Sequence, residues 1–251
     1  MLPEICHIGP FTIYSYGLML VLAFFVCAYL AALQAKKEQM DREGIYNLCF
    51  YCFIFGIIGS RVFYVLINAR FYLHNPLEII MLQHGGMAWF GGLIFGTSGA
   101  ILFIKKHKMN LFRSLDLLAP FIALAQAIGR IGCLLNGCCF GRESKFGLYF
   151  KVSGQILIPT QLYSSLLLLL IFITLRLKQD TKHLPGEIFC GYLFLYSLKR
   201  FFIEFLRNDS PRIFYGLTLF QILCLAMLFL SLAMFVKLLV IKKNKGDGSV
   251  L

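Results

Sequence analysis

The sequence has few charged residues. Only 14% of its 251 residues are Asp, Glu, Lys or Arg, whereas soluble globular domains average about 25%. Hydrophobic residues make up 59% of the chain. This balance excludes an ordinary soluble enzyme and predicts a polytopic membrane protein that has the lipid bilayer as its surroundings.

Acidic residues are scarcer than basic ones: 12 Asp and Glu stand against 24 Lys and Arg, and the formal net charge is +12. A strongly basic balance is common in nucleic-acid-binding proteins, where the basic residues gather on one face or stripe. Here they lie mainly in short loops between apolar runs, where they set membrane topology. We therefore expect no nucleic-acid partner.

Several catalytic motifs are missing. The sequence has no Gly-x-Ser-x-Gly nucleophile motif and no plausible Ser-His-Asp set, and none of its five histidines is central to an apolar run. These absences exclude acyl transfer through a serine nucleophile. No Asp-rich motif for a magnesium diphosphate is present, which disfavours a prenyl transferase. The first ten residues carry Glu4 and no Lys or Arg, so we expect no cleavable signal peptide.

The nine cysteines lie mostly within apolar runs. Cys49-x2-Cys52 resembles a redox dithiol, but aromatic residues surround it, and a thiol oxidoreductase is a disfavoured alternative. Cys133, Cys138 and Cys139 could bind a metal, yet no histidine lies in the same run. We expect these cysteines to be small packing residues, and we expect no metal and no other cofactor.

Seven apolar runs predict an all-α fold of seven transmembrane helices, because each is near or above the ~20 residues that span a bilayer. We expect a single transmembrane domain over residues 1–251, with 246–251 as a flexible tail. Glycines interrupt the fourth run, which predicts a broken or re-entrant helix there. The runs cover residues 12–33, 45–68, 86–104, 114–139, 159–177, 187–207 and 213–241.

Lys and Arg concentrate in alternate connections between these runs. The rich ones are 34–44, 105–113, 178–186 and the segment after 241, and the N-terminal segment has none. By the positive-inside rule, this pattern predicts an N-terminus outside and a C-terminus in the cytoplasm.

Arg130 lies inside an apolar run, at a depth where a charged residue usually faces a protein interior or a water-filled cavity. Gly129 and Gly132 flank it and leave room for a ligand, and Asn136 adds an amide donor. The planar guanidinium suits bidentate phosphate binding. This pattern predicts a site for an anionic, phosphate-bearing lipid headgroup. The alternative is an arginine bonded to carbonyls of a broken helix.

A second polar stripe lies in the sixth run. Tyr196, Arg200, Glu204 and Arg207 fall within about 80° of one another at ~100° per residue, so we expect them to point inward from one helix face. The alternatives are an Arg200–Glu204 pair that only joins helices and an Arg207 that reaches the membrane interface. Lys199 lies off the stripe and is predicted to reach that interface.

Arg61 is another cation within an apolar run. Ligand binding, a structural contact with backbone carbonyls and a side chain that reaches the interface are all compatible with its position.

The motifs together resemble those of the prolipoprotein diacylglyceryl transferase family, over nearly the whole chain. The matching segments are Tyr14-Ser15-Tyr16-Gly17-Leu18-Met19, Gly59-Ser60-Arg61, Gly85-Gly86-Met87 to Gly91-Gly92, Gly129-Arg130-Ile131-Gly132-x3-Asn136-Gly137-x3-Gly141, Pro159-Thr160-Gln161-Leu162-Tyr163 and Tyr196-x3-Arg200-x3-Glu204-Phe205-x-Arg207.

This resemblance implies an enzyme of lipoprotein biosynthesis in the bacterial cytoplasmic (inner) membrane. Such an enzyme transfers diacylglyceryl from phosphatidylglycerol to the lipobox cysteine thiol of a preprolipoprotein signal peptide, and it releases glycerol phosphate. It also implies that Arg200 assists at the phosphate, that Glu204 orients an arginine or accepts the thiol proton, and that Tyr16 and Tyr196 line the pocket. The implied phosphatidylglycerol-binding residues are Arg130, Asn136, Arg207, Gly129, Gly132, Gly141, Arg61 and Gln161.

The chain also departs from the family pattern. Phe90 stands where many members carry a histidine, and Cys133 and Cys138 stand where asparagine and glutamate are common. The Gly-Cys-Cys form resembles a variant branch of the family. Without the histidine, Glu204 or the substrate phosphate takes the thiol proton, or the acceptor is not a lipobox cysteine. Two alternatives stay open: a family paralogue with a non-protein acceptor, and a non-enzymatic protein that binds or transports anionic lipids.

Overall fold

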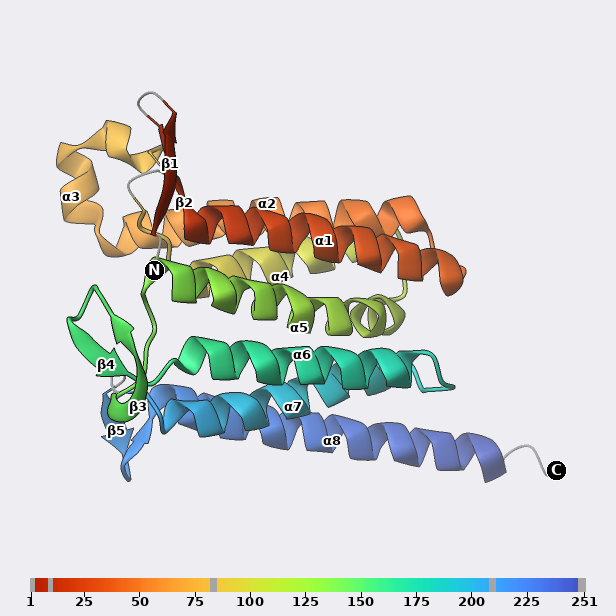
Figure 1. The fold of residues 1–251 in the computed structure, drawn as a ribbon. Coiled ribbons are helices and arrows are strands. Elements are labelled where there is room, and N and C mark those ends of the chain that lie inside the picture. The colour runs from red at the N-terminus through yellow and green to blue at the C-terminus, as the bar shows by residue number, and fades with distance from the viewer. Residues whose placement is uncertain (1–2, 9–10, 82–84, 208–210, 248–251) are drawn as a thin grey trace. The chain divides into compact units, whose positions relative to one another are not determined.

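The computed structural model describes residues 3–8, 11–81, 85–207 and 211–247. Within these residues, one long helix coincides with each of the seven predicted apolar runs, so the chain is mostly helical as predicted, with short strands besides (Figure 1). The long helices are α1 (Ser15–Lys37), α2 (Arg42–Ile67), α4 (Trp89–Lys106), α5 (Leu111–Asn136), α6 (Thr160–Gln179), α7 (Glu187–Glu204) and α8 (Leu219–Asp247).

The remaining elements are short. The helix α3 (Ala69–His74) and the 3-10 helix η1 (Pro76–Ile79) follow α2. Three two-stranded sheets pair β1 with β2, β3 with β4 and β5 with β6. Their strands are β1 (Glu4–Ile8), β2 (Phe11–Tyr14), β3 (Glu143–Phe150), β4 (Gln155–Leu157), β5 (Arg212–Phe214) and β6 (Leu217–Thr218). The predicted tail begins inside α8, and its last four residues lie outside the described residues.

Among the described residues, five helices are long and apolar enough to cross a membrane: α1, α2, α5, α6 and the part of α8 from Leu219 to Val240. Large apolar side chains such as Phe25, Leu66 and Phe229 lie exposed on them, as contact with lipid requires. The protein is therefore a polytopic membrane protein. Helix α7 does not qualify because it carries Glu187, Lys199, Arg200 and Glu204. Seven spans and the orientation of the termini stay predictions.

The chain forms two compact units. The first comprises residues 1–6, 13–23 and 115–251, and the second comprises residues 7–12 and 24–114. The single transmembrane domain stays a prediction.

The second unit is built on the pair α2 and α4, which run side by side (Figure 1). Their backbones come close at Gly59 and Gly91. A Cβ at Gly59 would lie 2.7 Å from the Gly91 carbonyl oxygen, and one at Gly91 would lie 2.3 Å from the Gly59 oxygen. Small residues allow such close helix packing in membrane proteins. The Cys52 thiol lies in this interface and donates to the Gly96 carbonyl at 3.6 Å.

The first unit has its core between α5, α6 and α7. Alanines on α5 leave space for larger apolar side chains of the other two helices, and the Ser165 hydroxyl on α6 donates to the Ala127 carbonyl at 3.0 Å. Helix α8 packs against α7. The buried residues of this core are Ala119, Ala123, Ala127, Leu168, Ile171, Leu175, Ile188 and Tyr192.

Helix α5 runs without interruption through Gly129 and Gly132 to Asn136. The prediction of a broken or re-entrant helix in this run is therefore wrong, because both glycines keep helical geometry and the chain turns only after them. Pro120 lies inside α5 and has no N–H for the Asp116 carbonyl, its partner in a regular helix. The Gln179 amide supplies a donor to that carbonyl at 3.3 Å.

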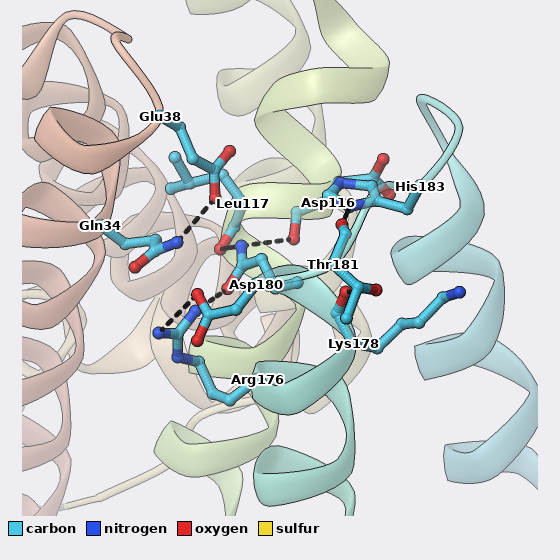
Figure 2. A network of polar contacts seen from close by, with 10 residues as sticks. Gln34, Glu38, Asp116, Leu117, Arg176, Lys178, Asp180, Thr181 and His183 are labelled. Atoms are coloured by element: carbon cyan, nitrogen blue, oxygen red, sulfur yellow. Dashed lines mark hydrogen bonds and ion pairs between the residues drawn. The ribbon is translucent and has the colours of Figure 1, made fainter.

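The Asp116 side chain caps the start of α7. Its two carboxylate oxygens accept hydrogen bonds from the backbone N–H groups of Gly186 at 2.5 Å and Phe189 at 2.8 Å. Figure 2 shows Asp116 beside the polar residues at the end of α6, where Arg176 pairs with Asp180 at 3.5 Å. The first N–H groups of a helix have no partner within it, so a buried carboxylate of α5 fixes where α7 begins.

We expect Asp116→Ala to destabilise the protein by about 2–4 kcal/mol, because each buried N–H group that loses its acceptor costs about 1–3 kcal/mol. Asp116→Asn keeps one acceptor and should lose less. Thermal unfolding in detergent measures the difference. The control is Asp180→Ala, whose side chain is 59% exposed and whose surface ion pair contributes about 0–1 kcal/mol. Equal losses for the two alanine variants would contradict the capping role.

Candidate functional site

The end of α5 folds into a tight turn. Gly137 (φ 72°) and Cys139 (φ 62°) both have left-handed backbone geometry, and Gly137 is the residue type that commonly ends a helix in this way. Two buried side chains at the start of α6 hold the turn: the Thr160 hydroxyl donates to the Cys139 carbonyl at 2.8 Å, and the Gln161 amide donates to the Cys138 carbonyl at 2.6 Å. The turn is therefore fixed by tertiary contacts.

Gly141 brings the segment after this turn against the end of α7. Its N–H donates to the Ile158 carbonyl at 2.9 Å, and it forms an isolated β-bridge with Arg207. A Cβ at Gly141 would lie 2.5 Å from the Leu206 carbonyl oxygen and 2.8 Å from a methyl group of Thr160. No side chain fits there, so glycine at this position lets the two backbones meet.

We expect Gly141→Ala to displace the end of α7 and to lower both stability and activity, because a Cβ 2.5 Å from backbone oxygen forces the backbone to move. The cost is about 1–3 kcal/mol or more, as for other overpacked sites. The matched control is Gly129→Ala, since a Cβ at Gly129 meets nothing within 4 Å. Folded yield and thermal unfolding of the two variants should differ clearly, and equal behaviour would refute the steric role of Gly141.

Basic side chains from α5, from α7 and from Arg207, which lies after the end of α7 and not on its predicted helical stripe, lie close together in the first unit. Arg130 interacts electrostatically with Lys199 and Arg200, and Arg200 interacts with Arg207. Glu204 is the one carboxylate that the described residues add to this group. Four basic side chains against one carboxylate make a local surplus of positive charge, which suits an anionic ligand. We call these five residues the basic cluster.

Arg130 is the member of the basic cluster that stands ready for a ligand. Its side chain is half-buried. In the part of the chain that the structure describes, no ion pair and no hydrogen bond joins its guanidinium to a protein group. The alternative of an arginine bonded to carbonyls of a broken helix is thus disfavoured, because α5 is continuous here. Guanidinium donors at this depth favour a charged ligand.

Arg200 is instead held by its neighbours. Its Nη2 lies 2.9 Å from Oε2 of Glu204, one helical turn away, and its guanidinium lies 4.9 Å from the centre of the Phe220 ring. Glu204 is 2% exposed, and its Oε1 accepts a hydrogen bond from the Thr218 hydroxyl at 3.2 Å. The ion pair, the ring and the hydroxyl together fix the position of the Arg200 fork.

Tyr16 and Tyr196 both border the basic cluster. Tyr16 lies near enough to Arg130 to interact electrostatically with it, and a Cβ at Gly132 would lie 3.4 Å from the Tyr16 ring. The start of α1 therefore packs on the end of α5. Tyr196 interacts electrostatically with Arg200. The structure thus brings together the arginine of the fourth run, the polar stripe of the sixth run and Tyr16.

Comparison with known proteins identifies the family of this chain. The family model for prolipoprotein diacylglyceryl transferase matches residues 3–237. The phosphatidylglycerol--prolipoprotein diacylglyceryl transferase of Listeria monocytogenes serotype 4a is 36% identical over 220 residues, which cover 83% of this chain and 79% of the relative. The chain belongs to the prolipoprotein diacylglyceryl transferase family. The proteins of the same name from Clostridium kluyveri (37% over 218 residues, 83% and 86% covered) and Listeria innocua (34% over 247 residues, 93% and 88% covered) are further relatives.

Other residues that the family resemblance predicted for the site lie outside the basic cluster. Asn136 ends α5 and lies near the Cys138 thiol, and Gln161 holds the turn after α5. Gly129 borders open space. These contacts make Gln161 a residue that positions the turn. The roles in lipid binding predicted for Asn136, Gln161 and Gly129 stay predictions.

Arg61 lies in the second unit and binds backbone carbonyls of η1 and of residues that follow it. The side chain is 6% exposed, and its nitrogens donate to five backbone carbonyls, at 3.0 Å for Ile79, 2.9 Å for Gly86 and 3.1 Å for Met81. The other two carbonyls belong to Glu78 and Gly85. These bonds favour the structural alternative for Arg61, and its predicted role in lipid binding stays a prediction.

The sequence analysis missed two residues that border this candidate site. Lys199 is 6% exposed and its ammonium lies 4.7 Å from the centre of the Tyr196 ring, so the prediction that it reaches the membrane interface is wrong. The three-residue spacing from Tyr196 was the available signal. Thr218, which bonds Glu204, gave no sequence signal because the contact joins two separate elements.

Proposed function

We propose that this protein transfers the diacylglyceryl group of phosphatidylglycerol to a cysteine thiol of a prolipoprotein and releases glycerol phosphate. The observation that carries the proposal is the basic cluster, in which Arg130 faces an excess of positive charge and makes no ion pair with the described residues. The relatives' names state the same donor and acceptor.

The chemistry fits the residues. The thiol sulfur attacks the diacylglyceryl carbon and gives its proton to the substrate phosphate, the carbon–oxygen bond breaks, and the electron pair leaves with glycerol phosphate. Negative charge therefore grows on the leaving phosphate in the transition state. Preorganised arginines stabilise such charge without reorganisation during the step. We assign phosphate binding to Arg130 and leaving-group stabilisation to Arg200.

Glu204 best fits a positioning role. One of its oxygens faces the Arg200 guanidinium and the other accepts the Thr218 hydroxyl. A carboxylate held in this way keeps an arginine in one orientation. A general base for the substrate thiol would not need either of these two contacts. We therefore assign Glu204 to the orientation of Arg200, while Tyr16 and Tyr196 border the phosphate.

The proposal includes the membrane arrangement. We propose seven spans, with the N-terminus outside and the C-terminus in the cytoplasm, in a multi-pass enzyme of the bacterial cytoplasmic membrane. The acceptor is a preprolipoprotein signal peptide that presents its lipobox cysteine in the outer half of the bilayer. The alternation of basic loops and the five apolar helices support this arrangement.

The test uses the purified full-length protein in micelles that contain phosphatidylglycerol and a lipobox peptide. Mass spectrometry should find a diacylglyceryl-sized mass gain on the peptide cysteine, together with released glycerol phosphate. A serine-substituted peptide is the control and should gain nothing. Release of glycerol phosphate without modification of the peptide would indicate that the acceptor is not a protein. If folded protein gave neither product, a lipid-binding or transport role would replace the transferase.

A further inference from the structure

Three cysteines converge at the turn after α5. Cys133 lies in the last turn of the helix, and the left-handed residues Gly137 and Cys139 fold the chain back so that Cys138 and Cys139 return to it. The three sulfur atoms all lie within 4.8 Å of one another. The sequence predicted separate packing residues, but the turn makes the thiols one group.

The spacing of the sulfurs suits a tetrahedral metal ion. A zinc–sulfur bond of about 2.3 Å places two thiolates of a tetrahedral site about 3.8 Å apart. The present spacing of at most 4.8 Å exceeds that value by about 1 Å, which rotation about the cysteine χ1 bonds can supply. The Cys138 thiol donates to the backbone carbonyl of Cys133 at 3.7 Å, so it lies against the last turn of α5.

Two arginines lie near the three thiols. Arg130 and Arg207 interact electrostatically with Cys139, and Arg130 also interacts with Cys133. Nearby cations stabilise thiolates, which are the form that binds metal. Three thiolates and a divalent cation carry one net negative charge, and the two arginines offset it. The hydrogen bonds from Thr160 and Gln161 hold two of the three cysteines in place before any ion binds.

The group offers three ligands, and among the described residues no fourth cysteine, histidine or carboxylate joins it. Structural zinc sites have four protein ligands, whereas catalytic ones have three and keep one position for water or substrate. We propose that Cys133, Cys138 and Cys139 form a three-thiolate site for a thiophilic divalent cation of the zinc class, with its fourth position open to an external thiol.

The external thiol is the acceptor cysteine, and this part rests on the proposed function. When that cysteine binds as the fourth ligand, its S–H bond releases a proton to water and the sulfur becomes a thiolate. The thiolate sulfur then forms a bond to the diacylglyceryl carbon, the carbon–oxygen bond breaks, and glycerol phosphate leaves with the electron pair. The cation keeps its charge throughout. Such a site supplies a thiolate without a histidine base.

The cation site is tested first, without lipid or peptide, on the reduced and metal-free full-length protein. Cd²⁺ is the probe because its thiolate complexes absorb in the ultraviolet. We expect one Cd²⁺ per chain, with loss of stoichiometric binding in Cys133→Ser and in Cys139→Ser. The matched control is the double variant Cys49→Ser/Cys52→Ser, which removes two thiols of α2 and should keep the site. Circular dichroism checks that each variant is folded.

Two results would overturn the cation site. One is the absence of stoichiometric Cd²⁺ binding by folded protein, or binding that persists when all three cysteines are serine. The other is a disulfide between two of the three sulfurs in the protein as isolated. Because no substrate is present, neither result bears on the transferase activity itself.

The open position is tested next by adding the lipobox peptide to the Cd²⁺-loaded protein. We expect a further rise in thiolate absorption that a serine-substituted peptide does not give. No rise would overturn the acceptor part while the cation site stands. Equal transfer rates for the zinc-loaded and metal-free enzyme would also overturn it, and the proposed function would survive.

Discussion

Arg130→Ala is expected to lower diacylglyceryl transfer by at least about 10²–10³-fold, the usual cost of removing one preorganised donor to a developing negative charge. The protein should still fold, because the described residues give the Arg130 side chain no ion pair or hydrogen bond that its loss would leave unpaired. The measurement compares peptide modification and thermal unfolding for the wild-type and variant proteins.

Two further variants sharpen this test. Arg130→Lys keeps the charge but loses the planar fork that binds phosphate in two places, so its activity should lie between those of alanine and arginine. Arg113→Ala removes an exposed arginine from the other end of α5 and should leave transfer unchanged. Normal turnover in Arg130→Ala would refute the assignment of phosphate binding to this side chain.

The polar stripe of α7 was predictable because helix geometry is fixed. A side chain every three or four residues returns to the same face, so Tyr196, Arg200 and Glu204 could be placed together from their spacing alone. The fourth run gave the weaker prediction. Gly129 and Gly132 were read as an interruption, but core packing of the alanines upstream and the cap at Gly137 keep α5 whole to Asn136.

What the sequence could not supply is the partner of each charge. Arg61 and Arg130 look alike in the sequence, as single arginines beside glycines in apolar runs. The difference is that η1 and residues after it supply five backbone carbonyls to Arg61. Likewise, Cys133 and Cys139 meet only because the turn after α5 doubles back. Such contacts depend on loop conformation, which no periodic sequence pattern predicts.

The second large effect concerns Glu204. We expect Glu204→Ala to lower transfer by about 10²-fold or more, since Arg200 loses the carboxylate that holds it. It should also destabilise the protein by about 3–5 kcal/mol, the cost of leaving a buried charge without its partner. Glu204→Gln can keep the hydrogen bond from Thr218 and should lose less stability. Both quantities are measured on the purified variants.

A double-mutant cycle separates the two roles considered for Glu204. If the carboxylate acts only by orienting Arg200, its removal matters no further once that arginine is gone. The double variant Arg200→Ala/Glu204→Ala should then transfer no more slowly than Arg200→Ala alone, and the two losses should be strongly non-additive. If Glu204 accepted the thiol proton, the losses would multiply. The contact of 2.9 Å between the two side chains leads us to expect the first outcome, because residues in direct contact that act as one unit lose their effect together.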